Sequence, residues 1–198
     1  MPAHARFFQR RRLSLYLASA RYTVMGLFFD ILSAINHPNQ QGSVEQLKVI
    51  VSNARQLGSR HGFDDSMLQT LLSVVGEFLR PVLRQSAVIG SVASEALIRQ
   101  AVDTASNYGA ASLPAFLTSE RQQQLLQALA QRTGLSNMTL QALLPGLLTV
   151  ALGFLNLGTG TSRTSGANPV LKSFLTTDRQ ENADLGEVFK FANRFLHP

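Results

Sequence analysis

Apolar side chains recur at intervals of three and four residues through most of the chain, which is the spacing of one face of an α-helix. No stretch alternates as a β-strand does, so the sequence predicts an all-α protein. The expected helices cover residues 25–36, 43–58, 64–85, 87–108, 118–132, 136–157, 169–175 and 185–196.

Several residues at the expected helix ends have the chemistry of helix caps. Ser43 and Gln46 form the pattern of a capping box, Asp64 or Asp65 suits the N-cap of the next helix, and Ser136 suits a third N-cap. Asp184 and Glu187 have the spacing of a second capping box. These residues predict where the helices begin.

A helix-turn-helix unit occurs twice when each residue is compared with the one 72 positions later. Gly62 matches the turn glycine Gly134, and apolar matches follow on the inward faces. The alternative is that any two leucine-rich amphipathic hairpins align this well. The clearest matches are Leu57 with Leu129, Leu68 with Leu140, Leu71 with Leu143 and Leu72 with Leu144.

The two copies differ in how apolar their second helices are. Glu77 and Arg80 of the first copy correspond to Thr149 and Leu152 of the second, so we expect the second copy to be the more buried one. Each hairpin has an apolar stripe that it cannot cover alone, and the two are expected to pack on each other. The apolar stretch from Ala142 is estimated at about sixteen residues and contains Pro145, which is short of the ~20 needed to cross a membrane.

The chain divides into four regions: a basic extension at 1–24, a duplicated-hairpin domain at 25–157, a Gly/Ser/Thr-rich flexible linker at 158–168, and a C-terminal helical pair at 169–198. The extension is compatible with a mis-assigned start at Met25, a secretory signal peptide, or a transit peptide or basic arm. We expect a cytoplasmic protein, or an exported one if 1–24 is a signal peptide.

The charge distribution argues against nucleic-acid binding. The net charge is +6, but five of the eighteen Lys and Arg residues precede Met25, which leaves thirteen against twelve Asp and Glu residues. A helix-turn-helix reader of DNA also needs basic or amide side chains where its second helix begins, and the first copy has Asp64 and Asp65 there.

Candidate chemistry is sparse. The chain has no Cys, and none of His4, His37, His61 and His197 has a partner at the spacing of a metal site or catalytic triad. We therefore expect no enzymatic activity and no tightly bound cofactor.

One segment resembles a calcium-binding loop. Residues 176–187 lie between two predicted helices, with the layout of an EF-hand and a carboxylate at the closing position. Thr176, Gln180 and Glu181 replace the acids and the glycine that such a loop needs, so any calcium site is expected to be weak, and an ordinary capped loop is the alternative. The candidate ligands are Asp178, Asn182, Asp184 and Glu187.

The segments MGLFFDILSAI, HPNQQGSVEQL and GLSNMTLQALLPGLL, with NPVLKSFL and ADLGEVFKFANRFL near the end, resemble the YidB-like bacterial proteins of unknown function. The tail resembles a subgroup in which a degenerate EF-hand-like loop separates the last two helices. The resemblance runs from Met25 to the C-terminus and implies a helical fold without an established activity.

Together these features predict a non-enzymatic interaction or scaffold protein that binds a protein partner or associates with itself through its leucine-rich hairpin faces. A weak calcium-responsive module is one alternative. A membrane-associated protein, using residues 1–24 and the helix at 136–157, is the other and the less favoured.

Overall fold

The computed structural model describes residues 26–36, 42–88, 117–159, 168–176 and 184–197, which form seven α-helices and no strand. The predicted all-α fold is therefore confirmed over these ranges. The predicted helix at 87–108 lies almost entirely outside them. The helices are α2 (Gly26–Asn36), α3 (Val44–His61), α4 (Asp65–Val88), α6 (Ser119–Thr133), α7 (Asn137–Asn156), α8 (Pro169–Thr176) and α9 (Leu185–Leu196).

The two predicted hairpins, α3–α4 and α6–α7, have the same turn. Gly62 and Gly134 each end a helix in the left-handed conformation, with φ of 73° and 70°. Two residues later, the side chains of Asp64 and Ser136 cap the next helix by accepting hydrogen bonds from the third backbone N–H beyond them, at 2.8 and 3.2 Å. Matching caps at both ends of both turns support the duplication that the spacing predicted.

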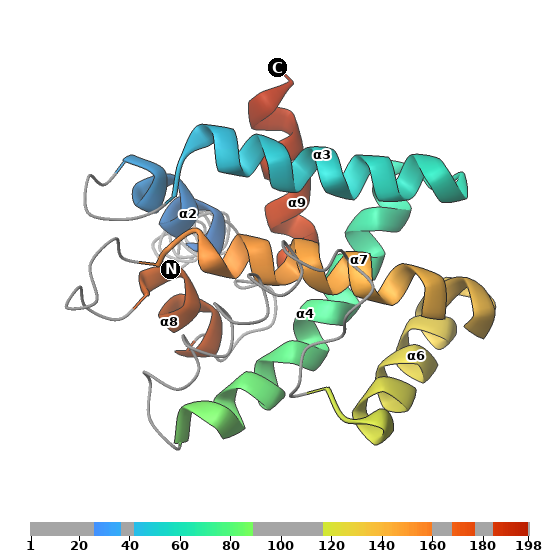
Figure 1. Ribbon diagram of the computed structural model, residues 1–198. Helices are drawn as coiled ribbons and strands as arrows, with labels where there is room; N and C mark the ends of the chain where they lie inside the picture. Colours follow the sequence, from blue (N-terminus) through green and yellow to red (C-terminus); the bar gives the residue numbers. More distant parts are fainter. Residues whose placement is uncertain (1–25, 37–41, 89–116, 160–167, 177–183, 198) are drawn as a thin grey trace, which may run out of the picture.

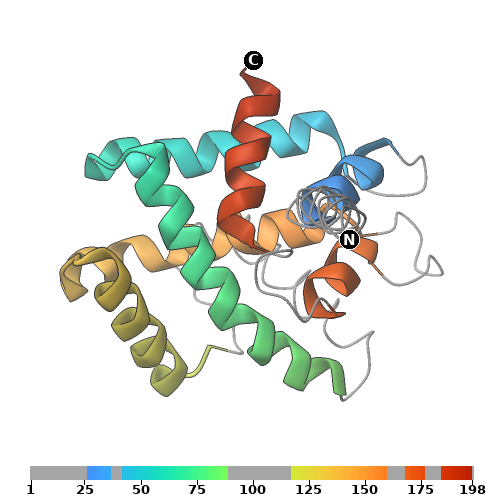
Figure 2. The same cartoon turned by 180° about the vertical axis from the view of Figure 1, so that it is seen from behind.

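The hairpins are interleaved. The first helix of each packs mainly against the second helix of the other, so that α3 lies along α7 and α6 lies along α4 (Figure 1). From behind, α4 crosses diagonally and α9 lies beside it (Figure 2). The leucine-rich faces that the sequence offered for self-association are thereby buried inside the chain, with Leu71, Leu72, Leu143 and Leu144 inaccessible to solvent.

Helix α7 lies in the core, where it packs against α3, α4, α6 and α8. Ten of its residues are buried. Ten of the described residues of α4 are buried as well, so the expectation that the second copy is the more buried one was wrong. Helix α7 has 20 residues and is capped by Ser136, in agreement with the predicted helix at 136–157, and Pro145 is accommodated inside it. By length and composition it is the one helix of the described ranges that could cross a membrane, but just over half of that stretch is buried within the chain. A buried core helix has the same composition.

The C-terminal helices belong to the same core rather than to a separate pair. Helix α8 packs mainly against α2, and α9 mainly against α4. Their apolar faces supply Phe174, Val188 and Phe189 to the cluster that the hairpins form. Asn168, where the predicted linker ends, is buried and donates to the carbonyl oxygen of Leu155 at 2.7 Å. The residue boundaries of the linker stay a prediction.

Candidate functional site

Two of the four candidate calcium ligands are within the described residues, and both are engaged in other contacts. Asp184 Oδ1 caps α9 by accepting from Gly186 N at 2.7 Å, and it also accepts from Ser73 Oγ at 2.6 Å. Glu187 Oε1 accepts from Gln69 Nε2 at 2.6 Å and from Lys190 Nζ at 3.0 Å. The predicted N-cap is thus confirmed, whereas Glu187 holds α4 and Lys190 instead of completing a capping box.

The remaining candidates, Asp178 and Asn182, lie outside the described residues. Within the ranges that the structure describes, no three His, Asp or Glu side chains are grouped closely enough to hold a metal ion. A weak calcium site therefore stays a prediction, and calcium would have to compete with Ser73 and Gln69 for its two best carboxylates.

The described histidines take part in ordinary side-chain contacts. His61 stacks on Phe63 with ring centroids 6.0 Å apart, and His197 Nε2 lies 3.3 Å from an Arg55 nitrogen. Neither ring is paired with a carboxylate in a described contact. His4 and His37 lie outside the described residues.

Arg80 is buried, contrary to the expectation that it marks the less buried copy. Only 7% of the residue is exposed, because α8 covers it and places the Phe174 ring 5.0 Å from its guanidinium carbon. Burial lowers the pKa of Arg80, nearby Arg84 lowers it further, and Asp184 and Glu77 act in the opposite direction.

Arg80 extends a polar stripe along α4 that faces the C-terminal helices. Asn193 Nδ2 donates to Asp65 Oδ2 at 2.8 Å, one turn before the Gln69 contact and two turns before the Ser73 contact. The four-residue spacing of Asp65, Gln69 and Ser73 was the sequence signal for a second contact face on α4. The stripe positions α9 against α4.

A surface groove with a largely apolar lining lies between α3 and α7. The two helices run antiparallel, and Leu57 and Ile50 of α3 lie against Gly146 and Gly153 of α7. A methyl group added at Gly153 would lie 3.2 Å from Ile50 Cγ1, so the missing side chain lets the helices approach closely.

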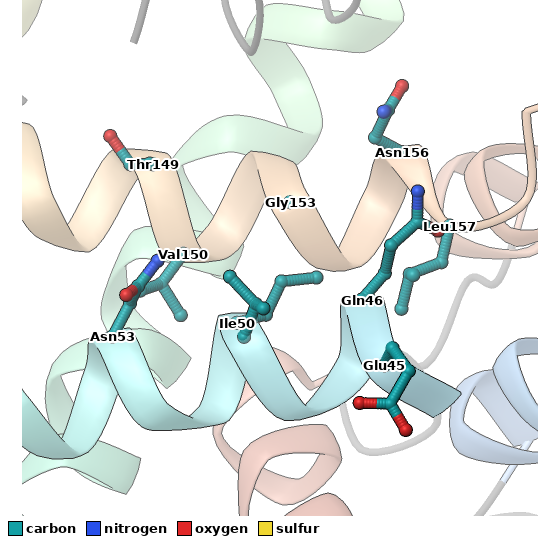
Figure 3. A pocket seen from close by; sticks show the side chains of 10 residues that line it. Glu45, Gln46, Ile50, Asn53, Thr149, Val150, Gly153, Asn156 and Leu157 are labelled. Carbon is teal, nitrogen blue, oxygen red and sulfur yellow. The ribbon is translucent and has the colours of Figure 1, made fainter. Parts of the chain in front are cut away.

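The groove has a volume of about 350 Å³, at the small end of the ~300–1,000 Å³ that binding clefts have. Partly buried Ile50 lines it, together with Val150 and Leu157, which are each only 3% exposed. Gln46 and Asn53 reach from α3 toward α7, whereas Asn156 and Thr149 of α7 point away from α3 (Figure 3). Val49, at 58% exposure, stands at the edge. The lining is apolar with an amide rim.

The α4–α6 face holds the positions that correspond to this groove in the other hairpin arrangement. At the α4–α6 face, 72 positions away, Phe78 stands in place of Val150 and Pro81 in place of Gly153. Arg121, the equivalent of Val49, donates from Nη2 to Gln85 Oε1 at 2.9 Å, and Gln85 is the equivalent of Leu157. The α4–α6 face thus has larger side chains and a side-chain hydrogen bond at positions where the α3–α7 groove has small or apolar residues.

The chain matches no protein-family model, no curated protein and no solved structure. Membership of the YidB-like family therefore stays a prediction. The sequence did contain a signal for the groove, namely Gly146 and Gly153 seven residues apart on an otherwise leucine-rich helix. That signal was not enough, because it does not say which helix lies against those glycines.

Proposed function

We propose that this protein is a non-enzymatic protein-binding module, and that the α3–α7 groove receives the apolar face of a helix. The observation that carries the proposal is the contrast between the two copies: an exposed valine and a glycine border the groove where an arginine and a proline stand at the α4–α6 face. An exposed apolar hollow in a water-soluble fold is a common mark of a binding surface.

The shape of the groove favours a helical ligand. Its walls are two turns of α3 (45–53) and two turns of α7 (149–157), so it is ~12 Å long at 1.5 Å per residue. Apolar side chains of an amphipathic helix, repeated at intervals of three and four residues, fit a groove of this length. The amides of Gln46 and Asn53 can then satisfy polar groups at its rim.

The charges around the groove disfavour an enzyme or a phosphate-binding role. Glu45 is the one ionisable residue among those that line it, and its carboxylate forms an exposed ion pair with Lys48 at 3.1 Å. A single solvated carboxylate provides neither a matched acid and base nor a positive surface for phosphate groups.

The test uses a fluorescent, conformationally stapled helix with leucines at positions i, i+3, i+4 and i+7, followed by fluorescence anisotropy. The account predicts saturable binding to the full chain, weakened at least tenfold by Val49→Arg and by Val150→Phe, which introduce the residues of the other copy. Met138 is 82% exposed and lies outside the groove, so Met138→Arg is the matched control. Binding that is absent, or equal in all four proteins, would refute the proposal.

A further inference from the structure

We infer that the helix received by the groove is α3 of a second copy of this chain, so that the protein forms a two-fold symmetric dimer through α3. The inference rests on the proposed function of the groove and names its ligand. The sequence offered the leucine-rich hairpin faces as the surface for self-association, but those faces are buried inside the chain. The α3 surface is one that solvent reaches.

The α3 surface carries both halves of a self-complementary contact. A two-fold interface uses the same patch on both subunits, so the patch must contain a protrusion and a hollow that fits it. Val49 projects from α3 at the edge of the groove, and Ile50, Val150 and Gly153 line the hollow beside it. Val49 of each copy can therefore enter the groove of the other.

The polar residues of α3 also meet complementary polar residues when a two-fold axis relates two α3 helices. When two antiparallel α3 helices cross at residue 49, residue 45 of one copy lies opposite residue 53 of the other. The Asn53 amide can then donate to the Glu45 carboxylate at two symmetric places, and both residues are exposed and line the groove. Lys48 lies opposite Ile50, so no two like charges meet.

The small size of the patch sets the expected affinity. Two turns of helix bury less than the ~1,200–2,000 Å² of a standard stable interface, so the dimer is expected to have a Kd in the micromolar range or weaker. The described helices of one copy already form a continuous core, so the monomer is expected to stay folded when the dimer dissociates.

Charge changes at Asn53 test the register without touching the core. Asn53→Lys places an ammonium opposite Glu45 of the other copy and should tighten the dimer several-fold in sedimentation equilibrium. Asn53→Glu places two carboxylates together and should weaken it by a similar factor. Shifts in the same direction for both variants would overturn the α3–α3 register.

The absence of Cys from the chain permits a direct proximity test. Val49→Cys in the full chain, treated with a short bismaleimide, should give a covalent dimer as the main product, whereas Met138→Cys should remain largely monomeric. Equal crosslinking of both variants, or none at Val49→Cys, overturns the dimer. If Val49→Cys does not crosslink but the stapled helix still binds in a Val49-dependent way, self-association fails and the proposed function stands. If the stapled helix does not bind either, both fail.

Discussion

The α3–α7 and α4–α6 faces occupy matching places in the two hairpins, 72 positions apart, and differ in what lies at their surfaces. Both pair the first helix of one hairpin with the second helix of the other. At α4–α6, Phe78 and Pro81 are present and Arg121 bonds to Gln85, while at α3–α7 the equivalent positions are Val150, Gly153, Val49 and Leu157. The pairing of the helices is the same at both faces, and the groove lies at the face where these positions hold small or apolar residues.

The largest expected effect on stability comes from giving position 152, or position 80, the residue found at the matching position of the other hairpin. Leu152 is 1% exposed inside α7, so Leu152→Arg buries a charge without a prepared partner and should lower the free energy of unfolding by about 3–5 kcal/mol. Arg80→Leu introduces the residue of the other copy at a buried site and should change the free energy of unfolding by less than ~1.5 kcal/mol. Chemical denaturation measures both. Equal losses would show that the two copies offer the same environment.

A smaller loss is expected at the glycines that let α3 approach α7. A methyl group at Gly146 would lie 3.0 Å from Leu57 Cδ1, so Gly146→Val should destabilise the protein by about 1–3 kcal/mol, although Val74 occupies the equivalent position of the other copy. Gly146→Ala is the control and should lose less, since alanine gains ~1 kcal/mol over glycine in a helix. Thermal unfolding of both variants would reveal whether close packing requires a glycine there.

The two turns should respond alike, because their geometry is the same in both copies. Gly62 and Gly134 have positive φ, and a methyl group added at either would meet no other atom within 4 Å. Gly62→Ala and Gly134→Ala should therefore each cost about 1–2 kcal/mol from backbone conformation alone. Urea unfolding gives both values. A large loss at one turn and none at the other would argue against a shared turn.

Calcium should not change the stability of the protein, because the two carboxylates at the start of α9 already accept hydrogen bonds from α4. Asp184 and Glu187 are bonded to Ser73 and Gln69, so we expect an unchanged Tm at millimolar calcium. Differential scanning calorimetry with calcium or with a chelator provides the comparison. A rise in Tm that Asp184→Asn removes, while keeping the helix cap, would instead establish a calcium site there.

Features set by neighbouring residues could be predicted from the sequence. The turn glycines and the caps at Ser43, Asp64 and Ser136 are decided within a few residues, and the structure has them where the pattern indicated. The periodic apolar residues also sufficed to predict the seven helices of the described ranges, but not how burial is shared between the two hairpins.

Features that depend on distant helices could not be predicted. The charge of Arg80 suggested exposure, but α8 arrives from far along the chain and covers it. Glu187 fits a capping box by its spacing, yet Gln69 on another helix engages it. The groove likewise depends on which helix lies against Gly153, and the interleaving of the hairpins decides that.

The most direct test of the account is sedimentation equilibrium of the full chain and of Val49→Arg over concentrations from micromolar to near-millimolar. Val49 is 58% exposed, so the substitution should change the free energy of unfolding by no more than ~0.5 kcal/mol, while placing the arginine of the other copy at the groove. The account predicts a reversible dimer for the unmodified chain, a monomer for Val49→Arg, and a dimer for Met138→Arg. A chain that is monomeric throughout, or that dimerises equally with Val49→Arg, would contradict it.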